Sequence, residues 1–142
     1  MNKNVSLERE LYSPMCDWLR NYLEHNYRTA EIRVLDTSQV NLDCVLDSLG
    51  VLNEYPQVIG IGMQIDVLGV VKTKFKTLLF FIEAKKTALN THDLGQILVY
   101  SRICNPEKAF LKTSGWTGCS RPYIHKEEAI IITKMIKTDD AN

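Results

Sequence analysis

The sequence predicts an α/β fold in which helices flank a mixed central β-sheet and one short helix is inserted. Four segments, 31–37, 63–71, 77–86 and 108–116, carry alternating or continuous apolar residues, as half-buried and fully buried strands do. Segments with helical spacing separate these strands. A length of 142 residues and a hydrophobic content of 45% suit a single domain, residues 1–142, with a substantial core.

The first helix is predicted by apolar residues that recur at helical spacing from Leu7 to Leu23. Two starts are open. Ser6 can cap the helix, in which case Pro14 bends it, or Ser13 can cap it with Pro14 at the first helical position. We prefer the first start, because it keeps the early leucines on the apolar stripe.

The short inserted helix follows the first strand. Segment 31–37 alternates as a strand does, and segment 42–49 then has helical spacing and ends at Gly50, a typical helix terminator. The Tyr-Pro pair at 55–56 breaks the chain before the central strands.

The two central strands are joined by a lysine-rich turn and should form a hairpin. A helix then follows, with Thr91 as its cap and Asn105 at its end. Because a helical crossover usually connects parallel strands, segment 108–116 should lie parallel to segment 77–86. Segment 129–136 is strongly apolar and predicts a last strand at the sheet edge.

Three charged residues lie where the central strands become polar: Asp66, Glu83 and Lys85. The period of a strand places Glu83 and Lys85 on one face, and a hairpin would bring Asp66 beside Glu83. Two adjacent carboxylates repel each other unless a cation lies between them, and such hard oxygen ligands suit Mg²⁺ or Mn²⁺. A bound metal with an amine beside it indicates hydrolysis of a phosphodiester.

These residues, together with a Q-x-x-x-Y helix, resemble the PD-(D/E)xK nuclease superfamily. The matching residues are Asp66, Glu83, Ala84, Lys85, Gln96 and Tyr100. The likeness is greatest to the branch that contains archaeal Holliday-junction resolvases and recombination-repair exonuclease domains. One departure is Ile65, where the family often has proline before its first Asp.

The resemblance implies a restriction-endonuclease-like core in α-β-β-β-α-β order. It also implies a Mg²⁺- or Mn²⁺-dependent deoxyribonuclease that acts in repair, recombination or restriction. Asp66 and Glu83 would bind the metal, with the Ala84 carbonyl as a third ligand. Lys85 would position or activate the attacking water.

Further residues complete the site under this resemblance. A glutamate on the first helix would bind the metal or its water; we prefer Glu10, with Glu8 as the alternative. A solvated acidic helix start would explain both glutamates equally well. Gln96 and Tyr100 are four apart and would hydrogen-bond near the lysine or the DNA backbone, although such a pair is also common on half-buried helices.

Five basic residues are candidates for contacts with DNA phosphates: Lys72, Lys74, Lys76, Lys86 and Arg102. Solvation at the surface is the alternative for each. The formal net charge is +0 and the pI about 6.8, whereas nucleic-acid-binding proteins are often basic. The local arrangement of charge matters more than its sum, so DNA is still the expected partner.

Two other interpretations of the motif stay open. The chain could be a nucleic-acid-binding or assembly module that keeps the nuclease fold without catalysis. Alternatively, the E-x-K residues could form a surface ion pair in an unrelated protein. In that case Asp66 should lie more than about 10 Å from Glu83, too far for one shared cation.

The remaining composition excludes several classes of protein. The four cysteines and three histidines show no zinc-ligand spacing. The first residues contain no apolar stretch typical of a signal peptide, and no apolar run is long enough to cross a bilayer. We therefore expect a cytoplasmic protein with no membrane partner, and a homodimer is open.

Overall fold

The computed structural model describes the backbone of residues 3–85 and 91–113, and the side chains of residues 12–84 and 95–111. The elements are α1 (Lys3–Asn26), β1 (Glu31–Asp36), α2 (Leu42–Ser48), the 3-10 turns η1 (Leu52–Glu54) and η2 (Pro56–Val58), β2 (Val67–Lys72), β3 (Thr77–Lys85), α3 (Thr91–Cys104) and β4 (Lys108–Thr113). The predicted segments beyond Thr113, including 129–136, lie outside the described residues, as does Lys86.

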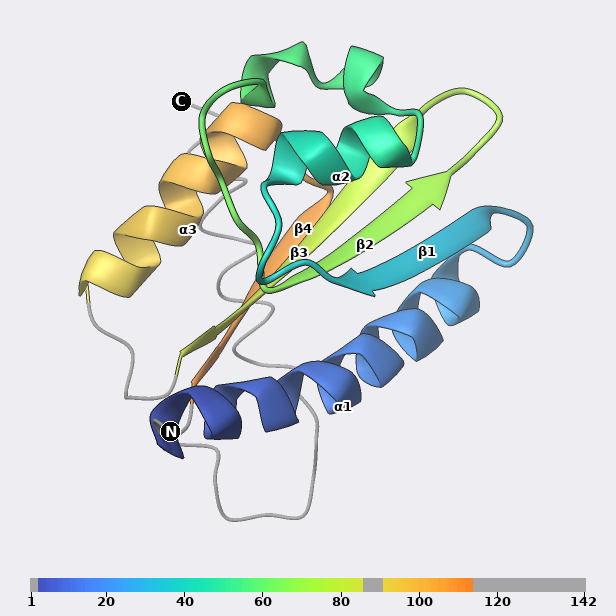
Figure 1. The fold of residues 1–142 in the computed structure, drawn as a ribbon. Coiled ribbons are helices and arrows are strands. Elements are labelled where there is room, and N and C mark those ends of the chain that lie inside the picture. The colour runs from blue at the N-terminus through green and yellow to red at the C-terminus, as the bar shows by residue number, and fades with distance from the viewer. Residues whose placement is uncertain (1–2, 86–90, 114–142) are drawn as a thin grey trace.

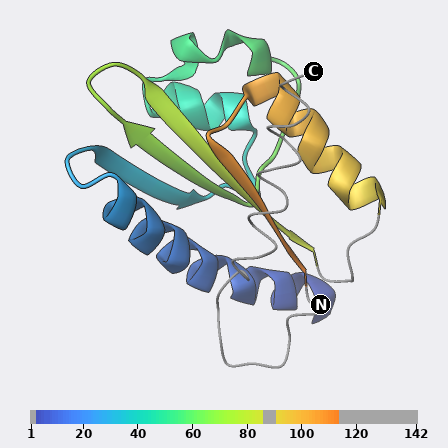
Figure 2. The same ribbon diagram turned by 180° about the vertical axis from the view of Figure 1, so that it is seen from behind.

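The four strands form one mixed sheet in the order β1-β2-β3-β4. Strand β2 is antiparallel to both β1 and β3, and β4 is parallel to β3. Helix α3 provides the crossover between the parallel strands. In Figures 1 and 2, α1 covers one face of the sheet while α2 and α3 cover the other. The predicted α/β class, mixed sheet and inserted helix are therefore confirmed.

The sheet has a hydrophobic core on each of its faces. Phe80 belongs to the core beneath α1, and Phe81 belongs to the core beneath α2 and α3. Consecutive residues of β3 point to opposite faces, so a strand buried on both sides must be apolar at every position. The prediction that this strand is buried on both faces is confirmed, since residues 79–84 are all buried.

Gly69 allows α1 to lie close to the centre of β2. A Cβ atom at this position would lie 2.9 Å from both Leu19 Cδ2 and Leu23 Cδ1, and 3.3 Å from Phe80 Cβ. A side chain here would therefore force the two leucine side chains, or α1 with them, to shift.

Helix α1 begins at Lys3 and continues through Pro14, so the prediction that Ser6 or Ser13 caps it is wrong. Proline inside a helix removes one hydrogen bond and costs about 3 kcal/mol. The residues after it include Met15 and Leu19, which are almost completely buried. Burying each such side chain contributes roughly 1.5–3 kcal/mol, so burial along the whole stripe outweighs the cost of the proline.

Strand β2 begins at Val67, not at Met63 as the apolar run predicted. Before it, the Leu42 amide donates to the Met63 carbonyl and the Thr37 hydroxyl donates to the Ile65 carbonyl. These loop contacts replace sheet pairing, so the prediction was wrong by four positions and Asp66 lies just outside the strand.

Two helices end where the sequence predicted. Gly50 ends α2 with a φ of 74°, and Asn105 ends α3 with a φ of 49°. Glycine and asparagine are the residues that most readily adopt this left-handed conformation. Thr91 is the first residue of α3 rather than its cap.

Candidate active site

Asp66 and Glu83 meet where the β2–β3 ladder ends. Val67 is paired with Ile82, so the next position along the same register sets Asp66 opposite Glu83. The Asp66 amide donates to Glu83 Oε1 at 3.2 Å, and the Ala84 amide donates to Asp66 Oδ2 at 2.8 Å. Each carboxylate thus accepts a backbone hydrogen bond from the other strand.

The burial of the pair is unusual for two acids. Glu83 is only 7% exposed, and Asp66 is half-buried. Carboxylates are rarely buried unless they are paired, hydrogen-bonded or bound to a cation. Because a 3.2 Å contact joins the two residues and Glu83 is buried, the surface ion-pair interpretation is wrong.

The backbone at Asp66 is fixed from the side of β1. The Thr37 amide donates to the Asp66 carbonyl at 3.0 Å, and the Thr37 hydroxyl donates to the preceding carbonyl of Ile65. Thr37 is itself buried. The acid pair therefore lies on a rigid frame made by three neighbouring strands.

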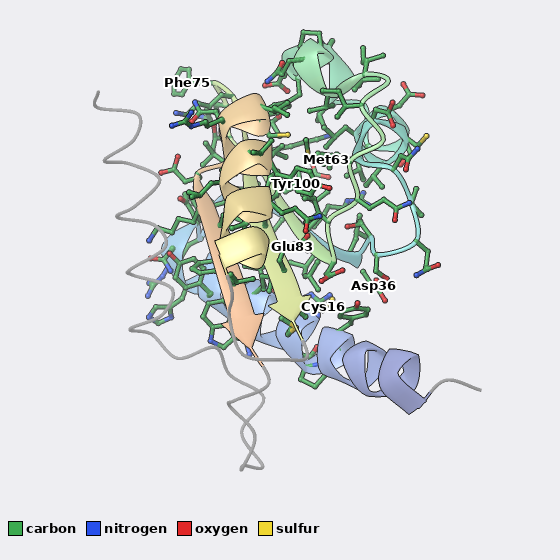
Figure 3. The ribbon with its side chains drawn as sticks, turned by 90° about the vertical axis from the view of Figure 1, so that its left-hand side faces the viewer. Cys16, Asp36, Met63, Phe75, Glu83 and Tyr100 are labelled. Atoms are coloured by element: carbon green, nitrogen blue, oxygen red, sulfur yellow. The ribbon has the colours of Figure 1, made fainter. Side chains whose placement is uncertain are left out.

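A cavity of about 280 Å³ opens over the acid pair on the α3 side of the sheet. It is lined by Ser38, Gly62, Gln64, Asp66, Glu83, Ala84, Gln96 and Tyr100. Figure 3 shows Glu83 and Tyr100 together beside α3. The structure therefore brings both Q-x-x-x-Y residues to the same cavity as the acids.

Gln96 and Tyr100 contact each other directly. The Gln96 Nε2 atom donates to the Tyr100 hydroxyl at 3.1 Å, as their spacing of one helical turn allows. Neighbouring Ile97 and Ser101 are buried and hold this part of α3 against the sheet. The pair thus forms a polar wall of the cavity on a fixed helix face.

The cavity lining also contains residues that were not predicted from the sequence. Ser38 follows β1, and Gln64 precedes β2, where its Nε2 atom donates to Asn41 Oδ1 at 3.2 Å. Gly62, between them in the cavity lining, has a φ of 76°. The glycine pair at 60 and 62 was the available signal, because closely spaced glycines mark a chain that bends sharply.

Three other predicted site residues, Lys85, Glu8 and Glu10, have a described backbone only. Lys85 is the last residue of β3, and Glu8 and Glu10 lie in the first half of α1. Their backbone positions are known, but their side chains lie outside the described residues.

Other predicted nucleic-acid contacts are separate from the acid pair. Lys72 and Lys74 lie at the hairpin end of β2 and β3, the opposite end from Asp66. The Lys72 ammonium donates to the Leu49 carbonyl at 3.0 Å, which gives this lysine a structural role at the end of α2. Arg102 is exposed in the last turn of α3.

The residues of the acid pair fit a hard divalent cation. Carboxylate oxygens and a backbone carbonyl are the donors that Mg²⁺ and Mn²⁺ prefer. Each carboxylate offers about four lone-pair sites, so its backbone hydrogen bonds leave capacity for a metal. Across the side chains at 12–84 and 95–111, no group of three or more His, Cys, Asp or Glu residues could hold a metal ion, so the described acids of the site are Asp66 and Glu83 alone.

Cys16 lies half-buried on α1 and does not provide a thiolate at neutral pH. Burial, and then the negative charge of Asp36, raises the pKa of its thiol to about 11. In the view of Figure 3, Cys16 and Asp36 are labelled below and to the right of Glu83.

Comparisons with protein-family models, with curated proteins and with solved structures find no match to this chain. Within the described part of the chain, no helix is long and apolar enough to cross a membrane. The functional argument therefore depends on the geometry of the site.

Proposed function

We propose that this protein is a nuclease that uses Mg²⁺ or Mn²⁺ to hydrolyse phosphodiester bonds in DNA. One observation carries the proposal: Asp66, just before β2, lies beside Glu83 of β3, and the pair faces a polar cavity. A buried and a half-buried acid side by side cost stability unless a cation or hydrogen bonds compensate them, and a metal site makes use of such a pair.

The metal would be held by the carboxylates of Asp66 and Glu83, with the Ala84 carbonyl as the third protein ligand. When bound, it would supply an activated water and neutralise charge on the scissile phosphate. The backbone amides of Asp66 and Ala84 hold the two carboxylates in place before any ligand arrives. Such preorganisation reduces the cost of binding.

Other residues would orient the substrate around the acids. The amide of Gln96 and the hydroxyl of Tyr100 can both donate hydrogen bonds to phosphate oxygens. The ammonium of Lys85, two residues after Glu83, would stabilise the charge on the phosphate or orient the water. The proposed arrangement corresponds to the restriction-endonuclease-like core that the motif resembles.

Helical spacing favours Glu8 over Glu10 as the third acid. Tyr12 of α1 donates to Asp66 Oδ1 at 3.4 Å, which shows which face of the helix is turned to the site. Glu8 is one turn before Tyr12, and Glu10 is two residues before it, about 200° around the helix. We therefore revise the preference from Glu10 to Glu8.

The proposal is tested by cleavage of labelled single-stranded, duplex and branched DNA, with RNA of the same sequence. Each substrate is incubated with Mg²⁺, with Mn²⁺ and with a chelator. We expect metal-dependent cleavage that is reduced at least 100-fold by Glu83→Ala and unaffected by Glu24→Ala, which removes an exposed carboxylate of α1.

Two outcomes would contradict the proposal. Equal cleavage by the wild type and Glu83→Ala would assign the activity to a contaminant. Binding of nucleic acid without any cleavage would instead support the module that keeps the fold and lacks catalysis.

A further inference from the structure

We infer that Tyr12 is a positioning residue for the metal site, and that its phenol fixes the Asp66 carboxylate before the metal binds. The inference depends on the proposed function, since it concerns the same acid pair. It assigns a role to a residue of α1, the helix on the opposite face of the sheet from the cavity.

Both carboxylate oxygens of Asp66 accept a hydrogen bond. Oδ2 accepts from the Ala84 amide at 2.8 Å, and Oδ1 accepts from the Tyr12 hydroxyl at 3.4 Å. Two different elements, β3 and α1, therefore hold one carboxylate. A group held at both oxygens has fewer orientations to lose when it coordinates a metal.

The position of Asp66 in the fold constrains its side chain only weakly. Asp66 lies just before β2, so regular sheet pairing does not fix its side chain as it would inside a strand. Asp66 is also only half-buried, so packing alone constrains it less than it constrains Glu83. The Tyr12 contact adds a constraint on the Asp66 carboxylate beside the hydrogen bond from the Ala84 amide.

Tyr12 is a polar residue on an otherwise apolar, buried stripe of α1. Its side chain is 7% exposed and lies on the same buried stripe of α1 as Met15 and Leu19. A phenol on this stripe could be replaced by an apolar ring without loss of packing. The hydroxyl adds a hydrogen bond to Asp66 that a phenylalanine could not make.

Two opposing effects decide whether loss of the Tyr12 hydroxyl weakens or strengthens metal binding at Asp66. A hydrogen bond to a carboxylate withdraws electron density and weakens its bond to a metal, but it also orients the group. The 3.4 Å contact is long for a hydrogen bond to a carboxylate, so its electronic effect is small. Orientation should dominate, as for other groups that hold metal ligands in place.

The test is Tyr12→Phe, which keeps the ring and removes the hydroxyl. Mn²⁺ binding is measured by calorimetry without substrate, and the Mg²⁺ dependence of cleavage is measured separately. We expect a roughly tenfold rise in the Mn²⁺ Kd and in the Mg²⁺ concentration for half-maximal cleavage. At saturating Mg²⁺ the cleavage rate should return to that of the wild type, which a general loss of structure would not allow.

Tyr22→Phe is the matched control, because Tyr22 is also on α1 and its hydroxyl accepts from Lys108 Nζ at 2.8 Å, away from the acid pair. This variant should bind Mn²⁺ as the wild type does. Equal affinity of Tyr12→Phe and the wild type, or equal weakening in both variants, would overturn the inference alone. A wild-type protein that binds no Mn²⁺ would overturn the proposed function as well.

Discussion

Replacing Glu83 with Gln should stabilise the metal-free protein and abolish its response to Mg²⁺. The amide keeps the shape of the side chain, and its oxygen can still accept the hydrogen bond from the Asp66 backbone. The change therefore removes one of two adjacent negative charges and keeps this hydrogen bond. A substitution that increases stability while removing metal binding is the signature of a site where two acids repel.

The magnitude follows from the strand pairing. Side chains directly opposite each other in an antiparallel pair have Cβ atoms about 5 Å apart. Two unit charges at that distance repel by about 3 kcal/mol at an effective dielectric constant near 20. Solvent at half-buried Asp66 and the weaker neutral hydrogen bond reduce the gain to about 1–2 kcal/mol. For a chain of this length, that corresponds to a rise in Tm of roughly 3–6 °C.

The assay is thermal unfolding in a chelator and in Mg²⁺. We expect the wild type to be stabilised by Mg²⁺ and Glu83→Gln to be more stable in the chelator but insensitive to Mg²⁺. Glu54→Gln is the control with the opposite sign: the Glu54 carboxylate accepts from both the amide and the hydroxyl of Thr77, so its loss should lower Tm. If Glu83→Gln is less stable than the wild type in the chelator, the repulsion argument is wrong.

Three further predictions concern the frame of the site. Gly69→Ala should lower the free energy of unfolding by about 1–2 kcal/mol, as measured by urea titration, because its Cβ would lie 2.9 Å from two buried leucine methyl carbons of α1; unchanged stability would show that α1 can shift freely. Burial raises the pKa of Tyr55 to about 12, and its hydroxyl donates to the Thr77 carbonyl at 2.5 Å. The folded state favours the neutral phenol, so stability should be complete below pH 10 and fall between about pH 10 and 12, a loss that Tyr55→Phe should reduce. Burial also raises the pKa of Cys104 to about 12, so an alkylating reagent at pH 8 should modify exposed Cys44 first and Cys104 only on unfolding, as mass spectrometry of the peptides would reveal.

The local elements could be predicted because their signals are local. Apolar runs located β2 and β3, and the turn between them is closed by the Thr73 amide, which donates to the Lys76 carbonyl at 2.9 Å. A tight turn fixes the register of a hairpin, and that register places Asp66 opposite Glu83. The meeting of the two acids was therefore already contained in the spacing of the sequence.

The limits of the elements depended on competing contacts. Strand β2 begins later than predicted because loop groups near Thr37 and Leu42 form hydrogen bonds with the residues before Val67. Helix α1 continues through Pro14 because burial of its apolar stripe outweighs the cost of the proline. Neither competition is visible in a window of neighbouring residues.

The sequence by itself determined the strands, the hairpin and the pair of acids, because each follows from periodicity and turn chemistry over a few residues. Only the tertiary structure decided what surrounds that pair. Tyr12 reaches Asp66 from 54 positions away, and Ser38 and Gln64 close the cavity from separate loops. Contacts between distant segments arise from packing α1 and the loops against the sheet, and packing leaves no periodic signal in the chain.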